Sequence, residues 1–487
     1  MRPTGNILDS VPCLLWQLCS NDAPMNARST GTGFFLERKR GQASTALLII
    51  NNLMSSLLCA CKRLAIFGWL LAVPVLVSGQ SAFSPGGNNY AIAGALAGDQ
   101  SSPQSAINSA GGYLVWQDNS ASTNGLRIKA VRLNPDLTAS GVPFVVSANA
   151  GSKITFDQEK PQVALLQGGG AVIVWQGGKY GFQKIYARFL SPNGTLLARD
   201  LLVNTYRPGF QINPAVAVLT DGSIIVVWAS DGQDGDLQGI FGQRLSAAGA
   251  KLGREFRLNQ WTAKNQRTPA VAALANGSFV AVWVSELQRA PASVDIYTRI
   301  FNSSGVAAGD EFPVNPDPTN ICANPSLAAS PQSGFMVAWS QKDVAALAVE
   351  GEIAGLPSTS RSTNGWDVVG SLFDVNGASV TSPVRLNTYV YGDQYAPKVS
   401  ACDNRYMTVW TSLGQDGSRE GVFGQFLTGS GAFEGPEFPV NTTTISRQIQ
   451  PAVAADGVNR FLVVWSSFVA NTSFDLYART YLETVGP

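Results

Sequence analysis

The chain has 487 residues, with 34 lysine and arginine residues against 33 aspartate and glutamate residues, and it contains no histidine. A charge balance this close to neutral gives no overall field that would draw the protein to nucleic acid or to an anionic membrane surface. The absence of histidine excludes Ser-His-Asp and Cys-His catalysis and the commonest zinc ligand, so any enzyme chemistry must use carboxylates, tyrosine, lysine or an oxygen-bound metal.

The amino-terminal part is predicted to carry a secretion signal. Lys62-Arg63 precede the fourteen apolar residues L-A-I-F-G-W-L-L-A-V-P-V-L-V and the small residues Ser78-Gly79, which is the order of a basic region, an apolar core and a cleavage site. We therefore expect residues 54–79 to be a signal peptide and residues 1–53 to be a disordered leader or a wrongly assigned start. The protein would then be secreted or held at the cell surface. It would meet a membrane only through this segment if left uncleaved, because a spanning helix needs about 20 apolar residues.

A recurring unit, typified by Asn204 to Asn259, fills the chain from about residue 90 onward. Each copy has a tryptophan at the end of an apolar run and a proline 13 or 14 residues before it. The tryptophans are Trp116, Trp175, Trp228, Trp283, Trp339, Trp410 and Trp465, and the prolines are Pro103, Pro161, Pro214, Pro269, Pro325, Pro397 and Pro451. These landmarks define repeats 1 to 7, and a period of this length predicts a repeat architecture.

Four strands are predicted in each repeat. In repeat 3 they are P-A-V-A-V-L, S-I-I-V-V-W-A, G-I-F-G-Q-R-L and E-F-R-L-N, named A to D in order. Strand B is apolar at successive positions, which indicates cover on both faces of the sheet. Strand D carries Pro313, Pro383 and Pro439 in other repeats, and because proline is tolerated mainly on edge strands, D is predicted to be outermost.

These features predict an all-β fold over residues 88–485: a single seven-bladed β-propeller of four-stranded antiparallel blades. Repeat 7 has only one strand after Trp465 and so lacks its D strand. The segment Tyr90 to Ala93 stands at the matching distance before Pro103 and is predicted to complete the carboxy-terminal blade. An open solenoid or two sandwiches remain the alternatives, although closure is the commoner way to protect sheet edges. We expect a monomer.

In a propeller of this kind the D-to-A and B-to-C connections share one face, so we expect a binding face there. Three residues before the repeat proline stands a glutamine in six of the seven repeats. These binding-face candidates are Gln100, Gln158, Gln211, Gln266, Gln394 and Gln448, with Cys322 in repeat 5. Their amides are suited either to satisfy backbone groups of neighbouring blades or to contact a ligand.

Two B-to-C connections are rich in acidic residues and glycine. Repeat 3 has Asp231, Asp234 and Asp236, and repeat 6 has Asp416 and Glu420. Carboxylates on a sharply turning loop suit calcium, so calcium is the one cofactor predicted, although ordinary Asp-Gly turn chemistry explains the same residues.

Repeat 5 contains an insertion between Trp339 and Trp366. Long loops on a rigid scaffold are favoured places for binding. Trp366 beside this insertion is therefore a further binding-face candidate, and packing beneath the loop is the alternative.

Three segments resemble a repeat found in many large secreted bacterial proteins. They are N-T-Y-V-Y-G-D-Q-Y-A-P (387–397), G-Q-D-G-S-R-E-G-V-F-G-Q-F (414–426) and G-P-E-F-P-V-N (435–441). The resemblance covers residues 90–482, and such repeats often accompany hemolysin-type calcium-binding or adhesin-like modules. This chain lacks the G-G-x-G-x-D nonapeptide array of those modules, so the resemblance does not carry calcium-driven folding over to it.

The first functional prediction is a secreted, non-catalytic propeller that binds an extracellular glycan or protein, because no acid/base constellation stands out. The alternative is a carboxylate-dependent glycoside hydrolase or lyase on the same scaffold. A glycosidase needs two carboxylates about 5 to 10 Å apart. The candidates on the expected face are Asp99, Asp157, Glu159, Asp343 and Asp393.

Overall fold

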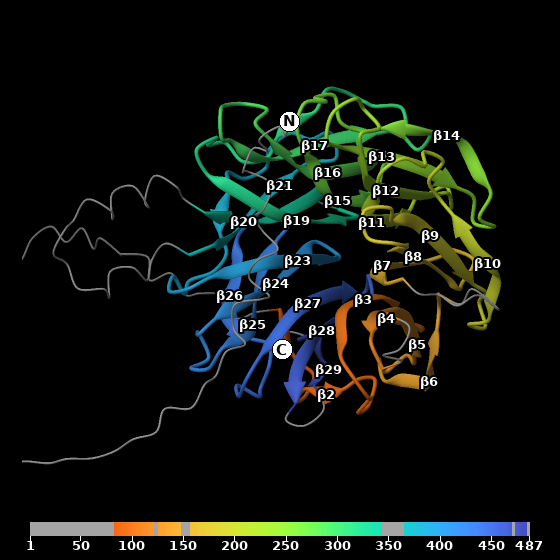
Figure 1. The fold of residues 1–487 in the computed structure, drawn as a ribbon. Coiled ribbons are helices and arrows are strands. Elements are labelled where there is room, and N and C mark those ends of the chain that lie inside the picture. The colour runs from red at the N-terminus through yellow and green to blue at the C-terminus, as the bar shows by residue number, and fades with distance from the viewer. Residues whose placement is uncertain are drawn as a thin grey trace, which may run out of the picture. The chain divides into compact units, whose positions relative to one another are not determined.

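The computed structural model describes residues 82–120, 125–147, 156–332, 334–342, 365–469 and 473–484, all within one compact unit, Leu76–Pro487. The predicted leader (1–53), the predicted signal peptide (54–79) and Asp343 lie outside the described residues. The described residues are all-β, with sheets arranged in the manner of a β-propeller (Figure 1). They contain no helix, and therefore none long and apolar enough to cross a membrane.

The strands follow the four-strand order predicted for each repeat. The first three repeats contain β3 (Gln100–Asn108), β4 (Gly111–Asp118), β5 (Arg127–Leu133) and β6 (Ala139–Val145); β7 (Gln158–Leu165), β8 (Ala171–Gly177), β9 (Lys184–Leu190) and β10 (Leu196–Leu202); and β11 (Gln211–Val218), β12 (Ile224–Asp231), β13 (Gln238–Leu245) and β14 (Lys251–Arg257). In each sheet the strands are antiparallel in chain order, and the fourth strand pairs only with the third. Strand D is thus an edge strand, as the prolines predicted.

Repeats 4 to 6 continue this pattern with shorter D strands in two cases. They contain β15 (Gln266–Ala273), β16 (Phe279–Glu286), β17 (Val294–Phe301) and β18 (Phe312–Pro313); β19 (Ile321–Ser330), β20 (Gly334–Lys342), β21 (Asp367–Phe373) and β22 (Val384–Arg385); and β23 (Gln394–Cys402), β24 (Arg405–Leu413), β25 (Glu420–Thr428) and β26 (Phe433–Pro439). One parallel residue pair, Val294 with Ile321, joins repeats 4 and 5 into an eight-stranded sheet.

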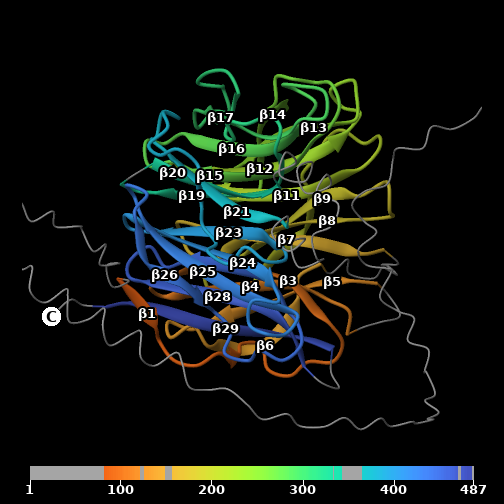
Figure 2. The same ribbon diagram turned by 90° about the vertical axis from the view of Figure 1, so that its left-hand side faces the viewer.

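Repeat 7 draws strands from both ends of the described chain. It contains β27 (Gln448–Ala455), β28 (Arg460–Val469) and β29 (Ser473–Glu483), and the free edge of β29 pairs with β1 (Phe83–Pro85) and β2 (Tyr90–Ala91). Figure 2 shows β1 beside β29. The predicted pairing segment Tyr90 to Ala93 overlaps β2, whereas the pairing of β1 was not predicted.

The apolar core lies between consecutive repeats. Each repeat tryptophan is buried against the preceding repeat, as Trp228 is against Val172 and Val174. A buried tryptophan removes roughly 150–250 Å² from water, which makes it the largest single contribution to such an interface. One cluster joins Val464 of repeat 7 to Trp116 of repeat 1. The consecutive apolar residues of strand B are covered on both faces because every sheet has a neighbour on each side.

Candidate functional site

The innermost strands β3, β7, β11, β15, β19, β23 and β27 each contact the next one, and β27 also contacts β3 (Figure 1). Strand A was predicted to begin at the repeat proline, but it begins three residues earlier and contains a register shift around that proline, as between Ile212 and Ala215. The residue before each proline has a positive φ: Ser102 (51°), Lys160 (52°), Asn213 (54°), Thr268 (49°), Asn324 (51°), Ala396 (54°) and Gln450 (55°). The proline disfavours helical backbone at the preceding residue and cannot donate a ladder hydrogen bond, so a bulge forms there.

Side chains of neighbouring repeats hold this bulge in place. The backbone N–H of Lys160 donates to Gln117 Oε1 at 2.8 Å, and that of Asn213 donates to Gln176 Oε1 at 2.7 Å. The N–H of Ser102 donates to Gln450 Oε1 at 2.7 Å. A positive φ in a residue other than glycine costs free energy and persists only where the surroundings fix it. These bonds supply that constraint.

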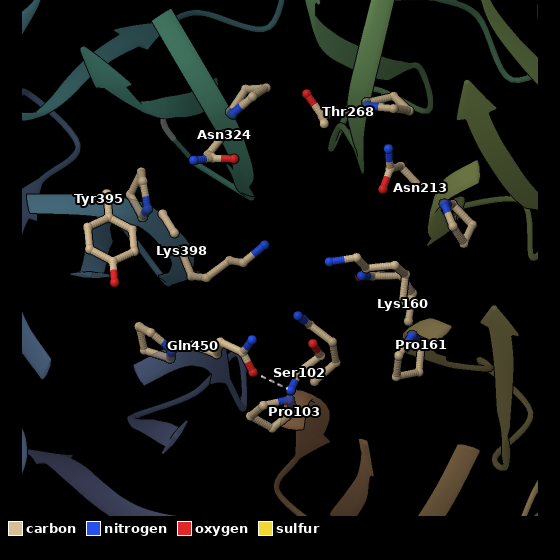
Figure 3. A pocket seen from close by; sticks show the side chains of 18 residues that line it. Ser102, Pro103, Lys160, Pro161, Asn213, Thr268, Asn324, Tyr395, Lys398 and Gln450 are labelled. Atoms are coloured by element: carbon tan, nitrogen blue, oxygen red, sulfur yellow. Dashed lines mark hydrogen bonds between the residues drawn. The ribbon is translucent and has the colours of Figure 1, made fainter. Parts of the chain in front are cut away.

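The seven bulges surround a pocket of about 410 Å³. Its lining residues include five carboxamides (Gln104, Gln162, Asn213, Asn324 and Gln450), the hydroxyls of Ser102, Thr268 and Tyr395, and two lysines, Lys160 and Lys398. Among the residues that the structure describes, no aspartate or glutamate lines the pocket. Figure 3 shows the two lysine side chains entering from opposite sides with their amino groups toward the middle. The pocket is therefore polar and cationic.

Burial lowers the pKa of Lys398 from its ordinary value of 10.5 to about 8, and the positive charge of Lys160 lowers it further in the same direction. Desolvation and a like charge both disfavour the ammonium form. With this pKa the lysine is mostly protonated at neutral pH but has a minor fraction of free amine, which is the form that accepts a proton or attacks an electrophile. Burial raises the pKa of Tyr395 to about 12, so its phenol keeps its proton.

The six predicted glutamines each stand two residues before the positive-φ residue of a bulge, and they do not line the pocket. All six side chains are buried. Gln211 is typical: its Nε2 donates to Pro208 O at 2.9 Å, and its Oε1 accepts from Asn204 Nδ2 at 3.1 Å. The backbone or asparagine bonds recur, with small variations, at Gln100, Gln158, Gln266, Gln394 and Gln448.

Asn204, the hydrogen-bond partner of Gln211, also bonds to the neighbouring strand C. Asn204 Oδ1 accepts the backbone N–H of Ile185 on strand C at 2.9 Å. The Gln–Asn pair thereby joins the D-to-A connection to the interior of the sheet. These contacts support the structural one of the two roles considered for the glutamines.

The acidic loop of repeat 3 is engaged by protein donors. Asp234 Oδ2 accepts from Asn259 Nδ2 at 3.0 Å, and Asp236 Oδ2 accepts the backbone N–H of Lys264 at 2.8 Å. Burial raises the pKa of Asp234, whereas the Lys264 N–H lowers that of Asp236. The backbone N–H of Asp231 donates to Phe210 O at 2.9 Å.

The acidic residues of repeat 6 also have protein partners. Asp416 Oδ1 accepts the N–H of Ser418 at 3.1 Å, and Glu420 pairs with Arg447 at 3.2 Å. Within the described part of the chain, no group of three or more carboxylates or cysteines is placed to hold a metal ion. Calcium binding by these loops stays a prediction.

Trp366 lies directly before β21 and is half-buried. Its backbone N–H donates to Asp393 Oδ1 at 3.1 Å, and its carbonyl accepts the N–H of Gln394 at 2.7 Å. Residues 343–364 of the adjoining insertion lie outside the described residues.

The carboxylates considered for a glycosidase are engaged elsewhere. Asp99 accepts from Asn119 Nδ2 at 3.0 Å, and Asp157 accepts the backbone N–H of Leu126 at 2.8 Å. Glu159 accepts from Gln176 Nε2 at 3.1 Å. None of these residues, nor Asp393, lines the central pocket.

Sequence reasoning missed Lys160 and Lys398, although a signal for them was present. The residues on either side of the repeat proline read S-P-Q, K-P-Q, N-P-A, T-P-A, N-P-S, A-P-K and Q-P-A from repeat 1 to repeat 7. The prolines are constant and their neighbours vary, and the only charged members are the two lysines. Positions that vary between repeats beside an unchanging proline are where we would expect residues that determine ligand specificity.

Comparison with known proteins yields no matching family model and no matching curated protein. Among solved structures, the chain is similar to polysaccharide lyase Uly1 (TM-score 0.48, 10% identity, 81% of this chain and 91% of that chain). It is also similar to a protein of unknown function from Dyadobacter fermentans (0.46, 14%, 68% and 95%) and to an α-L-arabinanase from Penicillium chrysogenum complexed with arabinobiose (0.42, 13%, 66% and 92%).

These similarities correct the first functional prediction. The chain was predicted to be a non-catalytic binding or scaffold propeller and not an enzyme, whereas the similar structures include a lyase and an arabinanase, which are enzymes. At such low identity the similarity concerns the fold, so the reaction of this chain has to be argued from its own pocket.

Proposed function

We propose that the described sheets form one closed seven-bladed β-propeller, with the amino-terminal segment as the outermost strand of the seventh blade. Ile92 supports this assignment: it is 2% exposed, and its N–H donates to Leu476 O at 3.1 Å. Leu258, which follows strand D of repeat 3, is fully buried and donates to Ile240 O at 2.8 Å. The amino-terminal residue thus makes the contacts of a D-strand residue in another repeat.

The residue three positions earlier supports the same assignment. Glu255, three residues before Leu258, accepts the backbone N–H of Thr205 at 2.6 Å. Asn89, three residues before Ile92, accepts the N–H of Thr442 at 3.3 Å. The amino-terminal segment therefore makes the same two contacts, at the same spacing, as strand D of repeat 3.

We further propose that the central pocket is the active site of a lyase that cleaves uronate-containing polysaccharides by β-elimination. The observation that carries this proposal is the pair of lysines that face each other in a pocket whose described lining contains no carboxylate. A two-carboxylate glycosidase has no catalytic pair there. A cationic pocket rich in carboxamides and hydroxyls instead suits a sugar that bears a carboxylate.

The two lysines have distinct roles in this reaction. The Lys160 ammonium pairs with the uronate carboxylate, and neutralising that charge makes the C5 proton more acidic. Lys398, as the free amine, removes the C5 proton, and the electron pair left on C5 forms the C4–C5 double bond as the C4–O bond breaks. The Lys398 ammonium then returns the proton to the departing oxygen. No water is consumed, and the product is an unsaturated uronate at a new chain end.

The test uses a panel of purified uronate polysaccharides and follows the ultraviolet absorbance of the unsaturated product. Lys398→Gln copies Gln104 and Gln162, and Lys160→Asn copies Asn213 and Asn324, so each variant places a residue that other repeats already accommodate. Removing a general base typically lowers the rate about 10²- to 10⁴-fold. Lys251→Gln, on the outer strand β14, is the matched control and should retain full activity.

Two results would contradict the proposal. One is release of reducing ends without an unsaturated product, which would indicate hydrolysis. The other is absence of turnover on the whole panel.

We propose that the protein acts outside the cell, at the cell surface or in the medium. A polysaccharide is too large to reach a cytoplasmic enzyme intact, and the predicted signal peptide over residues 54–79 supports the same location. Detection of the protein only in the cytoplasm of its native host would contradict this location.

A further inference from the structure

Exposed aromatic side chains gather on the edge of the sheets where the pocket lies. In every repeat, strand B ends beside the start of strand A, as the bond from Asp231 N to Phe210 O illustrates, so the D-to-A and B-to-C connections share this edge. The pocket-lining residues lie in the first half of the A strands, next to it. Of the strongly exposed aromatics among the described residues, Phe156, Tyr180, Phe182, Trp261, Tyr391 and Phe468 lie on this edge, and only Phe433 lies on the opposite one.

Repeat 2, which supplies Lys160, has the densest group of these aromatics. Tyr180 is 90% exposed and Phe182 is 59% exposed, both on the B-to-C connection, and Phe156 is 46% exposed on the D-to-A connection. The bond from Gly178 N to Asp157 O, at 3.3 Å, holds the two connections together. Large apolar side chains are mostly buried in soluble proteins, so three exposed rings on adjoining connections are a feature that a binding role would explain.

Repeat 6, which supplies Lys398, carries a second group. Tyr389 and Tyr391 meet edge to face with ring centroids 5.6 Å apart, and Tyr391 is 51% exposed. The half-buried Trp366 is joined to the same connection through its bond to Asp393. The two repeats whose lysines enter the pocket from opposite sides (Figure 3) therefore also carry aromatic groups on the adjoining connections.

We propose that a polysaccharide chain crosses this face from repeat 2 to repeat 6, with sugar rings stacked on the Tyr180–Phe182 and Tyr389–Tyr391 groups and a central uronate between the two lysines. The inference rests on the proposed lyase function and adds that the enzyme cuts within long chains. Separate aromatic groups on the connections of the two lysine-bearing repeats suit the rings of one sugar chain, because a sugar ring offers an apolar face to an aromatic ring. A protein partner would instead favour one contiguous apolar patch.

The test compares wild type with Tyr180→Ser/Phe182→Ser, Tyr391→Ser and the control Phe433→Ser, which removes a similarly exposed ring (45%) from the opposite edge. Two readouts are used: KM for long polysaccharide and for a trisaccharide, and retardation of the protein in gels that contain the polysaccharide. Each rim variant should raise KM for the long chain and weaken retardation about tenfold for each ring removed, because the apolar sugar face that stacked on that ring then stays in water. Trisaccharide turnover and the control should stay unchanged.

Each outcome decides one of the two proposals. Unchanged KM and retardation in the rim variants, with turnover intact, would overturn the chain-crossing inference and leave the lyase function standing. Retardation that depends on the rim without any turnover would retain the inference as a binding track and overturn the lyase. Loss of self-association in a rim variant, with retardation unchanged, would assign the aromatics to a protein contact and overturn the inference.

Discussion

Replacement of Lys398 by glutamine tests the electrostatic argument directly. The pKa of this lysine is lowered from 10.5 to about 8, and at 1.36 kcal/mol per pH unit that corresponds to roughly 3 kcal/mol of cost for the charged form. Because the side chain is only partly buried, we expect about 2 kcal/mol of this cost to be realised. Below pH 8 both the folded and the unfolded chain hold the proton, so the wild-type protein bears the full cost.

The sign of the pH dependence follows from proton binding. Between about pH 8 and the ordinary lysine value of 10.5 the unfolded chain binds more protons than the folded one, so wild-type stability rises with pH across this window. Glutamine does not titrate. Lys398→Gln should therefore be more stable than wild type at neutral pH by about 2 kcal/mol, and this advantage should vanish above the window.

Guanidinium unfolding at neutral pH and at a pH above 10.5 measures the difference in stability between Lys398→Gln and wild type under each condition. Lys160→Asn serves as the companion variant, because removing the neighbouring charge should raise the pKa of Lys398 and shrink the wild-type rise in stability. A Lys398→Gln protein that is less stable than wild type at neutral pH, or whose difference does not change with pH, would refute the claim that the pocket holds an unfavourable charge. It would also remove the reason for treating Lys398 as a base.

Three further outcomes follow from the fold. Phe83→Ala should destabilise the protein by about 3 kcal/mol or more, since the buried ring stacks on Phe426 at 5.5 Å, and a loss below about 1 kcal/mol in denaturant unfolding would contradict its role in fastening the amino terminus. Gln211→Ala should cost about 1–3 kcal/mol in the same assay, because Asn204 loses its partner, and an unchanged midpoint would count against the structural role. Calcium should raise the thermal midpoint of wild type but not of Asp231→Asn; equal wild-type midpoints in calcium and in chelator would dismiss the calcium hypothesis.

Much of the fold could be predicted from the sequence because the same pattern of residues recurs in each repeat. The tryptophan and proline landmarks fixed the period, the consecutive apolar residues predicted a strand buried on both faces, and the prolines of strand D marked an edge. The start of strand A was misplaced by three residues. A proline suggests a strand boundary locally, but bonds from the neighbouring repeat, such as Gln176 to the N–H of Asn213, carry the strand through it as a bulge.

The candidate site depended on tertiary structure. The glutamines stood out because they recur, and recurrence here reflects a bond that every sheet needs, such as Gln211 to Asn204. Lys160 and Lys398 occupy different positions relative to their prolines and are far apart in sequence, so no local pattern relates them. Only the contacts between successive A strands bring the two cations into one pocket, where burial and mutual repulsion change the chemistry of an amine. The sequence by itself determined the repeating unit, and the meeting of non-equivalent residues from different units was decided by the assembled structure.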